Sequence, residues 1–250
     1  MRRISTCLAL LGLAVLALSA SASAAPTITM KAVAVPIKGF PHTGNILGAG
    51  AALQTKFTIS GTEYGGFPPP LTEVKFYGPA GAKLHTQGFA TCAPSVIQEK
   101  GPQACSKKSS AGPKGSASGV VSFGTERVAE TVSVQPFFAP GGNLSFFVDG
   151  TSPVSIEILS TGKIVSSSPP FGPTVEAQVP LIESVPGALD ASAKEINVTV
   201  GAAYKKGKKT HYYIVVPKKC PKGGFPLKAQ MSFLGGATAE ATYKAPCPKK

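Results

Sequence analysis

The sequence predicts an all-β fold, an antiparallel β-sandwich of ten or more short strands with Gly/Pro-rich loops. Apolar and polar residues alternate with a period of two along most of the chain, and this period is typical of strands with one buried face. The 250 residues include 28 glycines and 23 prolines, which favour many turns and leave little room for long helices. Only residues 94–100 read as a short helix.

The alternation defines nine strand segments in chain order. They are residues 53–60, 73–76, 131–135, 144–149, 154–158, 175–181, 195–200, 227–233 and 238–243. A tenth segment, residues 210–216 (THYYIVV), is apolar on both faces and is expected to be a central strand covered on both sides. We predict one sandwich domain over residues 25–250, with a split into two β units near 166–173 as the alternative.

The N-terminus has the pattern of a cleaved signal peptide, residues 1–24. Arg2 and Arg3 precede a 12-residue apolar run from Cys7 to Leu18, and Ala22-Ser23-Ala24 then forms an A-x-A site. Twelve helical residues rise only about 18 Å, whereas a hydrocarbon core is about 30 Å thick. We therefore predict cleavage after Ala24 and no transmembrane segment in the mature protein.

Four cysteines remain after cleavage, and an even number in an exported chain predicts two disulfides. Four cysteines allow three pairings. The pairing that closes the shortest loops is Cys92–Cys105 with Cys220–Cys247, and this is the one we predict. A zinc site is the rival interpretation, but C-x-x-C is absent and the histidines are not spaced like ligands, so we expect no metal and no cofactor.

Positive charge is concentrated at the C-terminal end of the chain. Residues 201–250 contain 11 lysines and one acidic residue, Glu240, out of a formal net charge of +13. Such an excess attracts anions. The candidate polyanion-binding residues are Lys205, Lys206, Lys208, Lys209, Lys218, Lys219 and Lys222. A solvated surface that discourages edge-to-edge aggregation is the alternative.

Candidate sites of other kinds are sparse. Tyr204, Tyr212 and Tyr213 lie beside the lysines and form a candidate aromatic platform for an acidic glycan or peptide; packing in the core is the alternative. A serine hydrolase would need a nucleophile and a base, but G-x-S-x-G is absent. A glycosidase would need two facing carboxylates. The available glutamates are Glu63, Glu73, Glu126, Glu130, Glu157 and Glu183. We assign no catalytic residue.

Several segments resemble a group of uncharacterised exported β-rich proteins of high-GC Gram-positive bacteria. They are residues 201–209, 217–224 and 243–248, together with the stretch around Phe89, Cys92, Cys105, Gly112 and Gly115. The resemblance covers about half of the mature chain. It implies a secreted or wall-associated β-protein and carries no functional residue with it.

These observations predict a secreted or cell-wall-associated, non-enzymatic structural or adhesive protein. Its lysines would be attracted to an anionic envelope polymer, without sequence-specific recognition of nucleic acid. A binding module for an acidic glycan or peptide is one alternative, and a hydrolase on a β-scaffold is another.

Overall fold

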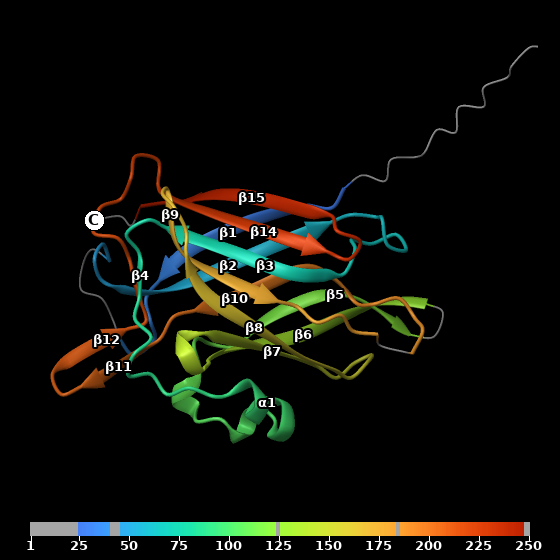
Figure 1. Ribbon diagram of the computed structural model, residues 1–250, viewed down its shortest axis with the longest axis horizontal. Helices are drawn as coiled ribbons and strands as arrows, with labels where there is room; N and C mark the ends of the chain where they lie inside the picture. The colour runs from blue at the N-terminus through green and yellow to red at the C-terminus, as the bar shows by residue number, and fades with distance from the viewer. Residues whose placement is uncertain (1–24, 41–45, 124–125, 184–185, 248–250) are drawn as a thin grey trace, which may run out of the picture.

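The computed structural model describes residues 25–40, 46–123, 126–183 and 186–247. The predicted signal peptide and its cleavage site after Ala24 lie outside the described residues. One antiparallel sheet of 13 strands and a separate two-stranded hairpin form the fold, with a single α-helix in the described part of the chain (Figure 1). The predicted all-β, sandwich-like architecture is confirmed.

The large sheet bends into two layers. The upper layer in Figure 1 contains β1 (Thr27–Val35), β2 (Gly50–Ser60), β3 (Leu71–Pro79), β14 (Phe225–Phe233) and β15 (Thr238–Ala245). The lower layer contains β5 (Gly115–Phe123), β6 (Glu126–Phe138), β7 (Leu144–Gly150) and β8 (Ile156–Ser166). The layers are joined on one side by β9 (Phe171–Gln178), between β3 and β8, and on the other by β10 (Ser192–Val200), between β2 and β5. The first and last strands, β1 and β15, lie side by side in the upper layer.

All nine predicted strand segments fall in strands or overlap them, and two further long strands were missed. The missed strands are β1 and β5. The segment 166–173, which the sequence offered as a boundary between two units, lies at the turn between the paired strands β8 and β9. A continuous sheet therefore runs through this part of the chain.

The predicted central strand over residues 210–216 is wrong in one respect, because it is broken at Tyr213. Residues before the break form β12 (Lys209–Tyr212), which pairs only with β11 (Ala203–Lys206) in a projecting hairpin. Residues after it form β13 (Ile214–Val215), which lies between β2 and β4 (Lys83–Leu84). The break occurs where the ring of Tyr213 packs into the interior against Phe138.

The one α-helix, α1 (Pro94–Lys100), has the bounds predicted from sequence. Proline occupies its first turn, where its missing N–H is not needed, and Gly101 follows its last residue with φ of 74°. The Cys92–Cys105 disulfide closes the segment, which continues through η1 (Pro102–Ala104) and η2 (Lys107–Ser109). Ile97 packs with Phe137 and Phe147 on the outer face of the lower layer.

The main core fills only part of the space between the layers. It is formed by inward-facing residues of β1, β2, β14 and β15 together with Leu71 of β3, and Phe57 meets Phe76 edge to face at 6.3 Å. Its inward residues on β14 are nearly inaccessible to solvent: Leu227, Ala229, Met231 and Phe233. The interior beside β5 to β10 is packed less completely, and this difference defines the site described below.

Candidate functional site

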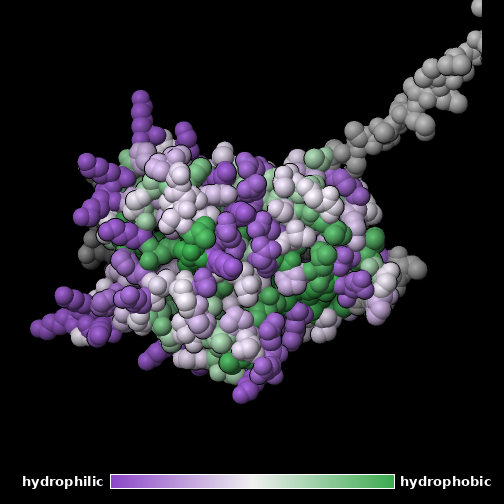
Figure 2. All heavy atoms as spheres, in the orientation of Figure 1, coloured by the Kyte–Doolittle hydropathy of each residue, from purple (hydrophilic) through white to green (hydrophobic). Residues whose placement is uncertain are grey.

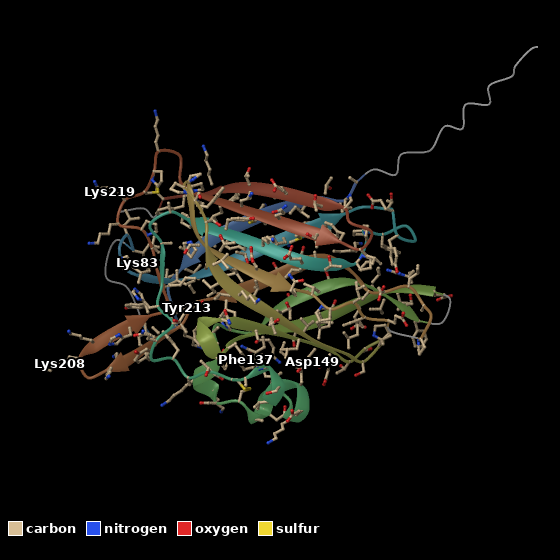
Figure 3. All side chains as sticks on the ribbon, in the orientation of Figure 1. Lys83, Phe137, Asp149, Lys208, Tyr213 and Lys219 are labelled. Atoms are coloured by element: carbon tan, nitrogen blue, oxygen red, sulfur yellow. A yellow bond between two sulfur atoms is a disulfide. The ribbon has the colours of Figure 1, made fainter. Side chains whose placement is uncertain are left out.

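The predicted lysine clusters gather at one end of the molecule. We call this the lysine-rich end and define it by Lys83, Lys205, Lys206, Lys208, Lys209, Lys218, Lys219, Lys222 and Lys244. Lys83, Lys208 and Lys219 lie together at the left of Figure 3, and Figure 2 shows hydrophilic side chains projecting there. The fold explains this proximity, because Lys83 pairs with Val215 just before Lys218, and Gly223 lies beside Lys244.

The sequence clusters account for seven of these nine lysines. Lys83 and Lys244 were not predicted, because β4 and β15 bring them to this end from distant parts of the chain. Across the described ranges, none of the nine lies within 4 Å of a carboxylate, whereas Lys56, Lys75 and Lys228 elsewhere do form ion pairs. The charge of this end is therefore available to solvent and to anions.

The predicted aromatic platform is only partly present. Tyr204 stacks on His211 with ring centroids 4.9 Å apart and meets Phe89 in a T-shaped contact, and its hydroxyl donates to the Gln87 carbonyl oxygen at 3.5 Å. Tyr213 is 1% exposed, so its assignment to a surface platform is wrong. Burial raises the pKa of Tyr213 far above its usual range. Tyr204 and His211 line a shallow groove with His85, Lys206 and Tyr212, and no carboxylate is among the described residues that line it.

A cavity of about 300 Å³ lies between the layers where the main core ends. Its walls are the inward faces of β2, β3 and β5 to β10. They consist almost entirely of apolar side chains, including Leu53, Phe76, Val132, Phe146, Val148, Ile158, Val175 and Val198. These eight residues have the same inward alternation as the core residues, yet each is only half-buried. Protein interiors are normally close-packed. A space of this size among apolar side chains therefore either holds a ligand or lowers the stability of the folded protein.

Small residues at inward positions help to leave this space open. Ala117, Gly119 and Ala177 line the cavity and fill little of it, whereas the inward residues of the main core include Leu227, Met231 and Phe233 beside its alanines. Gly119 cannot be replaced without a shift, because an added Cβ would collide with the carbonyl oxygen of Ser192 on β10. The sheet geometry itself therefore keeps a side chain out of this part of the interior.

Among the buried polar groups that line the otherwise apolar cavity, Glu130 and Tyr213 each have an oxygen without a hydrogen-bond partner among the described residues. Glu130 on β6 is 4% exposed; its Oε2 accepts a hydrogen bond from the backbone N–H of Val154 at 3.2 Å. Its Oε1 has no hydrogen-bond partner among the described residues, and neither does the Tyr213 hydroxyl. Such groups are costly when left unpaired in an apolar interior, by about 1–3 kcal/mol each. Both atoms are enclosed by the surrounding protein and have almost no accessible surface.

The two groups lie toward opposite ends of the cavity. Tyr213 packs with Leu144 at the beginning of β7, whereas Oε1 of Glu130 lies beside Gly150 at its end. Gly150 lies six positions after Leu144 along the strand, a span of about 20 Å. Leu181, which belongs to the lining toward the Glu130 end, is 45% exposed. Figure 2 shows apolar side chains reaching the surface in the band between the layers.

A half-buried arginine, Arg127, holds the loops at the Glu130 end in place. Nη2 of Arg127 donates to Oγ of Ser192 at 2.9 Å, and its guanidinium lies over the rings of Tyr64 and Phe67 at 5.6 and 5.5 Å. The Tyr64 hydroxyl accepts from the backbone N–H of Asp190 at 3.2 Å. Burial lowers the pKa of Arg127, but arginine remains protonated in proteins. These contacts join the loops around residues 64–67 and 189–192 at this end.

Both predicted disulfides are present, Cys92–Cys105 and Cys220–Cys247. Two disulfides are typical of proteins that fold outside the reducing cytosol. None of the helices in the described ranges is long and apolar enough to span a bilayer. The same ranges contain no cluster of three or more potential metal ligands from His, Cys, Asp and Glu.

Searches for similar proteins among family models, curated proteins and solved structures found no match. The interpretation of the site therefore depends on its own geometry.

The cavity and the role of Glu130 were missed from the sequence, although one signal was present. Glu130, Val132 and Val134 are spaced two residues apart on one strand, so their side chains face the same side of the sheet. The alternation that predicts an inward face for the valines therefore also predicts an inward carboxyl group. Glu130 was considered only as one half of a glycosidase pair. No second carboxyl group belongs to the described lining of the cavity.

Proposed function

We propose that the protein is a non-enzymatic binding protein whose cavity takes the apolar chain of a small amphiphilic ligand. The observation that supports this most directly is the set of half-buried apolar side chains around a space of about 300 Å³. Ligand pockets in proteins are typically about 300–1,000 Å³ and mostly apolar, with a few polar groups that fix orientation. The cavity meets the criteria of size and apolar lining.

The size of the cavity sets the scale of the expected affinity. Unfilled volume in a protein core costs about 24 cal/mol per Å³, so complete filling of about 300 Å³ is worth at most about 7 kcal/mol. A binding free energy of that size corresponds to a Kd of roughly 10 μM. The loss of ligand freedom on binding would subtract from it.

Binding of a polarity-sensitive fluorophore, displaced by twelve-carbon amphiphiles, tests this function. We expect saturable binding with a Kd in the micromolar range. Ala117→Phe, which fills the cavity, should abolish binding. Ser116→Phe is the matched control, because Ser116 is adjacent on β5 but exposed on the outer face. Equal binding by the two variants would show that the probe does not occupy the cavity.

We further propose that the protein is exported and is secreted or retained at the cell wall. The two disulfides and the signal-peptide pattern of residues 1–24 support this proposal. Recovery of the chain from the extracellular or wall fraction, with Ala25 as its first residue, would agree with it. Recovery only from the cytosol with residue 1 retained would refute it.

A second candidate function is attachment of the lysine-rich end to an anionic envelope polymer. It is supported by nine lysines at one end with no carboxylate within ion-pair distance among the described residues. Retention on an immobilised polyanion should fall steeply with salt. Replacing Lys205, Lys206 and Lys208 with glutamate should weaken retention far more than the same change at Lys31, Lys163 and Lys194, which lie elsewhere on the sheet. Equal losses would show that only net charge matters.

A further inference from the structure

The groove beside the β11–β12 hairpin is a defined feature within the lysine-rich end. Its walls come from two distant parts of the chain, residues 85–89 after β4 and residues 204–212 of the hairpin. The Tyr204 hydroxyl donates to the Gln87 carbonyl oxygen at 3.5 Å, and the Tyr204 ring meets the Phe89 ring at 4.9 Å. These contacts hold the two walls together, so the groove exists only in the folded protein.

Histidine is concentrated in this groove. The chain has three histidines, and two of them, His85 and His211, belong to the lining. His211 pairs with Tyr204 across the hairpin, and the two rings lie nearly parallel with centroids 4.9 Å apart. His85 is exposed directly after β4. Lys206 is the third basic side chain of the lining.

The elements around the groove contain no acidic residue to compensate these basic groups. Residues 74–98 and 201–239, which include both walls, contain no aspartate or glutamate. The same is true of β2 and η3 (Pro140–Gly142), which lie against the walls at Gly50 and Gly142. The groove is therefore suited to an anion.

The charge of the groove depends on pH in the physiological range. The other titratable side chains of the lining are Tyr204, Lys206 and Tyr212, and the remaining hairpin lysines and Lys83 lie in the adjoining strands. Histidine changes its charge between about pH 5 and 8, whereas lysine is positive and tyrosine is neutral throughout this range. The two histidines therefore add positive charge as the pH falls.

We propose that the groove is an anion subsite in which His85, His211 and Lys206 hold one anionic group of a polymer, and that this binding tightens as the pH falls. The inference rests on the proposed attachment to an anionic envelope polymer and specifies its site and pH dependence. An anion in the groove favours the protonated histidines, so binding takes up protons. A polymer suits the site better than a free ion, because further lysines such as Lys83 and Lys208 extend the positive charge beyond the groove (Figure 3).

The test measures the Kd for fluorescently labelled dextran sulfate at pH 7.5 and at pH 5.5, at constant salt. Sulfate esters are ionised at both pH values, so only the charge of the protein changes. The Kd should fall by about fivefold or more at pH 5.5, because each added contact with a polyanion releases counterions. In a variant that carries both His85→Gln and His211→Gln, the change should shrink to about twofold or less.

A matched control moves the histidines out of the groove. Thr131→His and Thr161→His, at exposed positions on β6 and β8, restore the number of histidines when they are added to the double variant. Neither position lines the groove, so the pH dependence should stay small. A full return of the pH dependence would show that only net charge matters and would refute the subsite.

The outcomes separate the inference from the function beneath it. If dextran sulfate fails to bind at either pH, the subsite and the attachment function are both refuted. If it binds equally at both pH values, or if the double variant keeps the full pH dependence, the attachment function stands and the subsite is refuted. Should the double variant not fold, calorimetry of the unmodified protein in buffers of different ionisation enthalpy decides the question, because the subsite requires proton uptake on binding and an uptake of zero would overturn it.

Discussion

Replacing alanine with leucine, which adds three carbon atoms, should stabilise the protein at position 117 and destabilise it at position 229. The two variants are Ala117→Leu and Ala229→Leu. Both residues face inward, but Ala117 lines the cavity and Ala229 is 0% exposed in the filled core. At Ala117 the three additional leucine carbons enter empty space, which is worth about 0.8 kcal/mol per buried carbon, or about 2.4 kcal/mol in all. Restricting the new side chain costs about 0.5–1 kcal/mol, so a net gain of about 1.5 kcal/mol is expected.

At Ala229 the same carbons have no space to enter. Ala229 lies between Phe76 on β3 and Ala241 on β15, so the larger side chain should force neighbouring residues apart, at a cost of about 1–3 kcal/mol. Ala229→Leu is therefore the matched control for Ala117→Leu, with an identical chemical change and the opposite expected sign.

Urea unfolding of the disulfide-intact protein measures both changes. With a slope near 3 kcal/mol/M, the midpoint of Ala117→Leu should rise by roughly 0.5 M and that of Ala229→Leu should fall by a similar or larger amount. Ala117→Leu should also weaken fluorophore binding, because it occupies the space that the ligand needs. Destabilisation of both variants by similar amounts would refute the claim that the interior beside β5 is unfilled.

Three further predictions follow from single groups. Burial raises the pKa of Tyr213, so stability is fully present below about pH 10 and is lost at higher pH; Tyr213→Phe should remove this loss in alkaline urea titrations. A hydrogen bond from Lys56 lowers the pKa of Glu195, so its stabilising effect should disappear as pH falls through that lowered value; an NMR titration should show Lys56→Ala raising the pKa. Replacing Cys92 and Cys105 with serine should cost about 3 kcal/mol by the loop-entropy estimate, and unchanged thermal unfolding would contradict it.

The sequence could predict the strands because alternation is a local property. Val132 and Val134 face inward, as do Phe146 and Val148, and the structure places all four on the cavity wall. The disulfide pairing was predicted correctly for the same reason, since each bridge closes a short loop. Local patterns of this kind need no knowledge of the partner strands.

The cavity could not be predicted because it depends on distances between strands that are far apart in sequence. Phe76 and Val198 line the same space, yet nothing in either segment reports how far apart β3 and β10 lie. Tyr213 was misplaced for a related reason: its neighbours Tyr212 and Ile214 belong to different sheets, and the break between them is set by packing against Phe138. Only Glu130 carried a usable local signal, a charged residue at an inward position.

The juxtaposition of β1 and β15 has a consequence for folding. The two strands lie about 200 residues apart in sequence yet contact each other, so this side of the sheet forms only when both are present. Contacts between residues so far apart in sequence form slowly. Truncation within Thr238–Ala245 would leave the edges of β1 and β14 uncovered and prone to intermolecular pairing.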